Sequence, residues 1–135
     1  MTLEPVSLWH ERPQLVSASS GSLTRSGGPW CQAGQPVRDN SARSVAAGLA
    51  PPFAGPNCFH HVREFCDGVV TVTEHQILHT TRLAFSNGLV LEPSGAAALA
   101  AFLHQKIERK ETEKTVVIVL TGGNVSPEEL SSFPE

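Results

Sequence analysis

Residues 116 to 120 form an unbroken apolar run, Val-Val-Ile-Val-Leu, which constrains the fold more than any other part of the chain. The length of the run is typical of a β-strand. Because neither face of such a strand would carry a polar residue, the pattern favours a strand covered on both sides, as in a parallel sheet flanked by helices. The sequence therefore predicts an α/β fold of mainly parallel strands.

This predicted strand is followed at once by a turn of small and polar residues, Thr121-Gly122-Gly123-Asn124. Ligands of open α/β sheets bind just beyond the carboxyl ends of such strands. Thr121 has the first side chain there that can form a hydrogen bond, and Gly122 allows the backbone to turn sharply beside a bound group. The alternative is an ordinary joint between a strand and a helix, since Ser126-Pro127 has the pattern of a helix start.

Three other segments carry recognisable patterns. Residues 44 to 49 are Ser-Val-Ala-Ala-Gly-Leu, and residues 69 to 74, Val-Val-Thr-Val-Thr-Glu, form a step from a strand to a helix. Glu92-Pro93-Ser94-Gly95 opens a helix of unusually small residues shortly before the apolar run. Together with the Thr-Gly-Gly-Asn turn they make four recognisable segments in a fixed order. Such an ordered set indicates a protein family much more specifically than any one segment does.

In these four segments the chain resembles the serine/threonine dehydratase and serine racemase family, the fold-type-II enzymes that use pyridoxal phosphate. The resemblance covers about residues 34 to 130. It implies the C-terminal part of the large, tryptophan-synthase-beta-like domain of that family. It also implies a small amino acid as substrate, with β-elimination and deamination of L-threonine or L-serine to a 2-oxo acid. The sequence does not choose between dehydratase and racemase.

The resemblance assigns cofactor-binding roles to Thr121, Gly122 and Glu92. It implies that the Thr121 hydroxyl bonds the pyridine nitrogen of pyridoxal phosphate, that Gly122 belongs to the same turn, and that Glu92 faces the cofactor region. A hydroxyl cannot keep that nitrogen protonated as a carboxylate would. The pyridine ring is then a weaker electron sink, which suits β-elimination. For Glu92 a structural alternative is open, because a carboxylate at a helix N-terminus gains ~0.3–1 kcal/mol from the helix dipole.

The residues that anchor the cofactor in the family have no counterpart in these 135 residues. The Schiff-base lysine of the Ser-x-Lys-x-Arg-Gly segment is missing, and the longest glycine run has two members, too few for the family's phosphate loop. Lys106, Lys110 and Lys114 are the only lysines, and they look like charges on or after a polar helix end. We therefore assign no catalytic residue.

The resulting expectation is a fragment or degenerate relative of a threonine/serine ammonia-lyase, inactive alone and paired with a complementary N-terminal fragment or with itself. The alternative, from another class, is a non-catalytic α/β module that uses an exposed sheet edge to pair with a partner chain.

Two regions of the chain differ in composition. Residues 1 to 43 are rich in Ser, Gly, Pro and Gln without a regular period, and we expect a poorly ordered arm that matches the family weakly. From residue 44 to 135 the pattern is α/β. We expect helices over residues 57–66, 74–86 and 94–110, a strand over 69–73, and a short helix after Ser126.

The helix predicted from residue 74 has the clearest local signals. Thr73 with Gln76 predicts a capping box at its start, and Asn87-Gly88 predicts a stop in the left-handed conformation. Its spacing predicts a buried face made of Ile77, Leu78, Thr81, Ala84 and Phe85.

Charge and composition exclude several classes of partner. The net charge of −3 and a pI near 6.0 argue against a nucleic-acid surface, and no run approaches the ~20 apolar residues of a membrane span. The odd number of cysteines, three, suits a reducing cytoplasm. His75 and His79 are four apart on one helix but lack the carboxylate of a zinc-protease pattern, so we expect no metal site.

Overall fold

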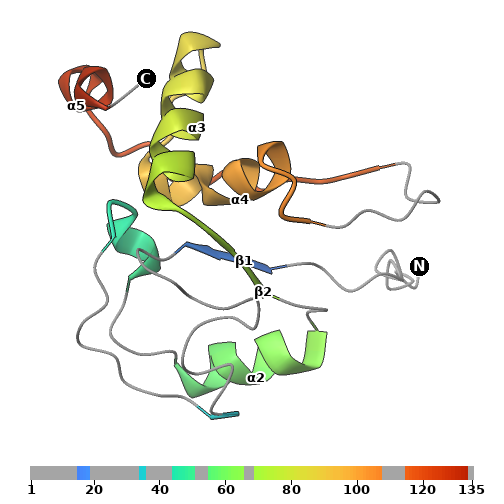
Figure 1. Ribbon diagram of the computed structural model, residues 1–135. Helices are drawn as coiled ribbons and strands as arrows, with labels where there is room; N and C mark the ends of the chain where they lie inside the picture. Colours follow the sequence, from blue (N-terminus) through green and yellow to red (C-terminus); the bar gives the residue numbers. More distant parts are fainter. Residues whose placement is uncertain are drawn as a thin grey trace, which may run out of the picture.

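The computed structural model describes residues 15–18, 34–35, 44–50, 55–65, 69–107 and 115–133. Two parallel strands, β1 (Leu15–Ala18) and β2 (Val69–Val72), pair with Leu15 opposite Val69 and Ala18 opposite Val72. Helix α4 (Pro93–Leu103) contacts both strands, and helix α2 (Pro56–Phe65) lies on the opposite side of the pair (Figure 1). Parallel pairing between flanking helices agrees with the α/β architecture expected from the sequence.

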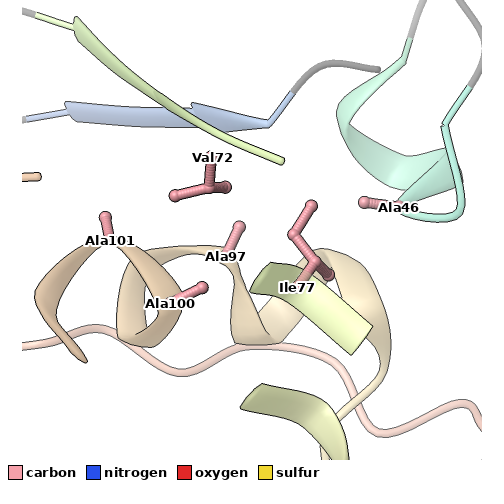
Figure 2. Close-up of a cluster of buried hydrophobic side chains, with 6 residues drawn as sticks. All are labelled: Ala46, Val72, Ile77, Ala97, Ala100 and Ala101. Atoms are coloured by element: carbon pink, nitrogen blue, oxygen red, sulfur yellow. The ribbon is translucent and has the colours of Figure 1, made fainter. Parts of the chain in front are cut away.

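The largest apolar core lies between β2, α4 and the start of α3 (Glu74–Ser86). In Figure 2, Val72 of β2 points towards the alanines of α4, and Ile77 of α3 lies beside them. Alanine side chains are short, so α4 can approach the strand pair closely. The buried members of this cluster are Ala46, Val72, Ile77, Ala97, Ala100 and Ala101.

Helix α3 follows its local sequence signals closely. Thr73 Oγ1 accepts the backbone N–H of Gln76, and the Gln76 side chain accepts the N–H of Thr73, which confirms the predicted capping box. At the other end Gly88 has φ 81°, as predicted for a left-handed stop. Of the predicted apolar face, Ile77, Thr81 and Ala84 are buried and Leu78 is half-buried, whereas Phe85 is exposed.

Helix α4 is shorter than predicted, because it ends at Leu103 and does not continue to residue 110. Gln105 has φ 52°, and the N–H of Lys106 donates to the carbonyl of Ala101 at 2.9 Å. These are the features of a Schellman motif, in which a left-handed residue after the helix satisfies its last carbonyls. Glycine usually occupies this position. Because this chain has a glutamine there, the end of the helix could not be predicted from the sequence.

The strand predicted at residues 116 to 120 is not present as a strand in the structure. Val117 is 78% exposed and Val119 is 68% exposed, so the expected cover on both faces is wrong as well. A strand needs a neighbour for its backbone hydrogen bonds. Within the described residues the sheet consists of β1 and β2 alone, and Figure 1 shows residues 115 to 126 running past α4 towards the last helix.

Strand β1 was not predicted, and it lies inside the region of residues 1 to 43 that we expected to lack regular structure. The rest of that region, apart from Gly34 and Gln35, lies outside the described residues, so its predicted poor order stays a prediction. β1 has four residues, and its pairing partner lies far along the chain. Local periodicity could not reveal such a pairing.

The short helix predicted after Ser126 is present as α5 (Pro127–Ser132). The Ser126 hydroxyl accepts the N–H of Glu129 at 3.1 Å, as an N-cap does. Leu130 of α5 is buried, and α5 packs against α3. The longest helix in the described part of the chain, α3, has 13 residues, short of the ~20 that a membrane span requires.

Candidate functional site

The turn at residues 121 to 125 packs directly against the N-terminus of α4. Gly95 is buried there, and a Cβ built on it would overlap the carbonyl oxygen of Thr121 and lie 3.1 Å from that of Gly122. Only glycine leaves room for the turn to come so close to the helix. The sequence motif around Glu92 and the motif around Thr121 therefore meet at one place.

Gly122 makes this turn possible in a second way. Its φ of 73° lies in the left-handed region, where residues with a side chain are strained. A Cβ at this position would also lie 2.6 Å from Oε1 of Glu92. The predicted glycine turn is therefore confirmed, and its shape depends on Glu92 as a neighbour.

Glu92 is bonded to the turn through both its backbone and its side chain. Its N–H donates to the carbonyl of Gly122 at 3.2 Å, and its Oε2 accepts the N–H of Asn124 at 3.2 Å. Glu92 is the N-cap residue of α4, as the structural alternative required, but its carboxylate makes no capping hydrogen bond. The half-buried carboxylate instead fixes the distance between the helix start and the turn.

Thr121 lies at the exposed edge of this arrangement. Its carbonyl faces Gly95, while its side chain is accessible from solvent. The structure thus brings Glu92, Thr121 and Gly122, the residues assigned from the sequence, into one small region. Thr121 is an exposed residue of this region.

A third segment reaches the same end of α4. The N–H of Gly48, in the 3-10 helix η1 (Ala47–Leu49), donates to Oγ of Ser94 at 3.0 Å. A Cβ on Gly48 would lie 2.9 Å from that oxygen, so glycine is needed for the contact. Both residues lie within the motifs described above, but their contact was not predicted from the sequence. Small residues in both motifs were the available signal.

The loop before η1 is fastened to α3 by Glu74. The Ser44 hydroxyl donates to Oε1 of Glu74 at 2.7 Å, and the N–H of Val45 donates to Oε2 at 2.7 Å. Glu74 therefore holds the loop that places Gly48 against α4. This supporting role was missed, because the two partners are some thirty positions apart in the sequence.

The lysine that the structure describes does not reach this region. Lys106 is exposed and follows the C-terminal end of α4, whereas Glu92 and Gly95 lie at its N-terminal end. An 11-residue helix is ~16 Å long, which separates the two ends well beyond contact. Lys110 and Lys114 lie outside the described residues.

Three histidines, His75, His79 and His104, form a separate cluster at the other end of α4. The rings of His75 and His79 stack with centroids 6.4 Å apart, and His104 meets His79 edge-on at 5.7 Å. Burial lowers the pKa of His104, with smaller contributions from the neighbouring His79, Lys106 and His75. Among the described residues, no group of three or more candidate ligands has the geometry to hold a metal ion.

The fold agrees with a comparison against families of known proteins. The family described as pyridoxal-phosphate dependent enzyme matches residues 8–122, most of the chain. The chain belongs to this family of pyridoxal-phosphate-dependent enzymes, in the class with fold type II. The match begins well before residue 34, where the resemblance seen in the sequence was expected to start, and it includes β1.

Its relatives include serine racemases and ammonia-lyases. The chain is 37% identical over 91 residues to serine racemase of Dictyostelium discoideum, covering 67% of this chain and 28% of that protein. It is 33% identical over 105 residues to L-threonine ammonia-lyase of Geobacter sulfurreducens, covering 77% of this chain and 26% of the relative. The chain thus spans less than a third of the length of these curated relatives.

Solved structures of the same kinds of enzyme share the fold of this chain. Maize serine racemase superposes with a TM-score of 0.71 and 25% identity, over 87% of this chain and 38% of that chain. Serine racemase of Dictyostelium discoideum superposes with a TM-score of 0.60 and 35% identity, over 70% of this chain and 30% of the other. The fold-type-II class inferred from the sequence motifs is therefore confirmed.

Proposed function

We propose that this chain forms the part of a pyridoxal-phosphate-dependent ammonia-lyase that holds the pyridine side of the cofactor. The reaction would be β-elimination and deamination of L-threonine or L-serine to a 2-oxo acid. The observation that carries the proposal is the contact of Glu92 with the Thr121 to Asn124 turn, in which Thr121 is an exposed residue. Relatives named as L-threonine ammonia-lyase and serine racemase support this class of substrate.

The shape of the turn suits a flat ring beside it. Gly122 has no side chain to occupy the space next to Thr121, and its φ lies in the left-handed region. When bound, pyridoxal phosphate supplies an electron sink for cleavage at the amino acid's α and β carbons. The neutral hydroxyl of Thr121 would bond the ring nitrogen without fixing a proton on it, and Glu92 would keep the turn in position.

The same 135 residues do not fit the other end of the cofactor. They contain neither the lysine segment nor the glycine-rich segment by which the serine/threonine dehydratase and serine racemase family holds the cofactor. Lys106 lies at the far end of α4. We therefore derive no covalent step within this chain. Catalysis would require these two segments in addition to the 135 residues.

The direct test is a chimera in which residues 44 to 135 replace the corresponding part of Geobacter sulfurreducens L-threonine ammonia-lyase. Release of 2-oxobutyrate from threonine is then measured for wild type, Thr121→Ala and Thr121→Ser. Alanine leaves the ring nitrogen without its partner, which costs about 1–3 kcal/mol, whereas serine keeps the hydroxyl. A fall for alanine and near-normal turnover for serine support the proposal.

Thermal unfolding of the three chimeras separates this effect from misfolding. Full activity of Thr121→Ala, or equal damage from serine and alanine in folded chimeras, would show that the hydroxyl is not the ring contact.

A second candidate function is a non-catalytic module that pairs with a partner chain. The exposure of the apolar residues 116 to 120 favours it, since buried apolar runs of this kind normally have strand neighbours. Binding of this kind does not depend on the cofactor site and can be tested on the chain alone.

A further inference from the structure

The carboxylate of Glu74 holds the beginning of the segment of residues 44 to 49 with both of its oxygens. Oε1 accepts the Ser44 hydroxyl at 2.7 Å, and Oε2 accepts the N–H of Val45 at 2.7 Å. Hydrogen bonds to an ionised carboxylate are shorter and about twice as strong as those between neutral groups. Glu74 is half-buried, so water competes less for these bonds than at an open surface. The carboxylate therefore fixes where the 44–49 segment begins.

The 44–49 segment is fixed at two further points. The Ser44 hydroxyl accepts the N–H of Ala46 at 3.0 Å, and the side chain of Ala46 is buried in the main core (Figure 2). The N–H of Gly48 donates to Oγ of Ser94 at 3.0 Å, in the first turn of α4. Three residues separate Ser44 from Gly48, which leaves little chain to absorb a shift. A displacement at the Glu74 end therefore reaches Ser94.

Ser94 shares the first turn of α4 with the residues that hold the candidate cofactor turn. Glu92 accepts the N–H of Asn124, and Gly95 leaves room for the carbonyl of Thr121. Packed side chains, hydrogen bonds and rigid helices are the structures that carry energetic coupling between distant groups. A shift of Ser94 therefore moves the residues that set the position of the turn.

We propose that Glu74 is a positioning residue for the candidate cofactor site and acts through the 44–49 segment and Ser94. Its carboxylate determines where Gly48 meets the first turn of α4, and the helix carries that position to the turn at Thr121. The consequence for the cofactor rests on the proposed function. The effect on the turn does not, and it can be measured in the chain alone.

The first test compares amide hydrogen exchange in wild type and Glu74→Ala, measured by NMR on the 135-residue chain. Loss of both acceptors releases the segment that keeps Gly48 beside Ser94. We expect the Gly48 amide to exchange about tenfold faster, which corresponds to ~1.4 kcal/mol. The Asn124 amide should also exchange faster, by a smaller factor. The Leu130 amide of α5 should be unchanged, which excludes a general loss of stability.

Two further variants separate the loss of these bonds from other effects. Glu128→Gln is the matched control, because Glu128 is also an acidic residue in the first turn of a helix but is exposed, and it should leave the Gly48 amide unchanged. Glu74→Gln keeps one oxygen that can accept the N–H of Val45, so it should restore part of the protection. If Glu74→Ala does not fold, Ser44→Ala removes one of the two bonds from the other side and should give a smaller increase.

A double-mutant cycle tests the route through Ser94. Ser94→Ala removes the acceptor of the Gly48 N–H and so separates the 44–49 segment from α4. In that background Glu74→Ala should no longer change the exchange of the Asn124 amide, because coupled residues give non-additive effects. An equal effect of Glu74→Ala in both backgrounds overturns the proposal. So does unchanged exchange of Gly48 or of Asn124 in Glu74→Ala alone.

The chimera described above tests the consequence for the cofactor, with affinity for pyridoxal phosphate measured by absorbance titration. Glu74→Ala should weaken binding several-fold, as Thr121→Ala does, whereas Glu128→Gln should not. Weak binding by Thr121→Ala with normal binding by Glu74→Ala would retain the proposed function and overturn the positioning role. Normal binding by Thr121→Ala would contradict the proposed function, while faster exchange of Asn124 in Glu74→Ala would still support control of the turn by Glu74.

Discussion

Gly95 lies so close to the carbonyl oxygen of Thr121 that no other residue fits between helix α4 and the candidate cofactor turn. This contact joins two sequence motifs that are more than twenty positions apart, and it orients the turn whose hydroxyl we assign to the cofactor ring. Two further glycines allow less extreme approaches: a Cβ would lie 2.5 Å from the Glu92 side chain at Gly122 and 2.9 Å from that of Ser94 at Gly48. The site is therefore built by backbone proximity around one helix end.

The first prediction concerns Gly95→Ala. Alanine favours a helix over glycine by about 1 kcal/mol, but its Cβ would overlap the Thr121 carbonyl, and overpacking of this kind costs about 1–3 kcal/mol. We expect a net loss in the free energy of unfolding, measured by urea denaturation. Gly55→Ala is the control, because nothing lies within 4 Å of its added Cβ. Unchanged or increased stability of Gly95→Ala would contradict the close contact.

The second prediction concerns the bond between Glu92 and Asn124. Glu92→Ala removes the acceptor of the Asn124 N–H, and a hydrogen bond of this kind contributes about 0.5–1.5 kcal/mol. We expect faster hydrogen exchange of the Asn124 amide, measured by NMR. Glu92→Gln keeps an oxygen acceptor and should have a smaller effect, and Glu128→Gln, at an exposed position of α5, should have none. Identical exchange in Glu92→Ala and wild type would show that the carboxylate does not hold the turn.

The third prediction is a dependence of stability on pH that comes from His104. Burial lowers its pKa in the folded chain, helped by His79, Lys106 and His75, and its Nε2 is buried without a hydrogen-bond partner. The unfolded chain therefore binds the proton more readily, with a pKa of about 6.5. The contribution of neutral His104 to stability is complete above that pH and is lost as the pH falls below it.

Denaturation at a series of pH values from about 7.5 to 5 measures this effect. His104→Gln should flatten the dependence, and His61→Gln, at an exposed position of α2, is the matched control. An equally steep loss of stability in His104→Gln would assign the effect to other groups.

The fourth prediction is that these 135 residues alone do not deaminate threonine or serine when pyridoxal phosphate is added. The expectation follows from the position of Lys106, the described lysine, at the end of α4 remote from Thr121. Release of 2-oxobutyrate from threonine and of pyruvate from serine should remain at the rate of free cofactor. Turnover above that rate, lost in Lys106→Arg, Lys110→Arg or Lys114→Arg, would show that one of these lysines anchors the cofactor.

Several elements could be predicted from the sequence because their causes are local. Thr73 and Gln76 cap α3 from three residues apart, Gly88 ends the same helix, and Ser126 starts α5 through Glu129. The partners of these hydrogen bonds lie within one helical turn of each other in the sequence, so the residue types alone determine the bonds. The order of four motifs was sufficient to identify the family, because a family is recognised from residues and their order in the chain and not from contacts.

The tertiary structure decided the features that depend on distant parts of the chain. β1 forms because β2 supplies its hydrogen-bond partners, and residues 116 to 120 lack a strand partner among the described residues despite their strongly apolar pattern. Glu92 was expected either to face a cofactor or to lie at a helix N-terminus; it is the N-cap residue of α4, and its carboxylate also accepts the N–H of Asn124, a contact that the sequence did not predict. In each case a backbone or side-chain group is satisfied by a partner that local sequence does not contain, and only the folded chain brings the two together.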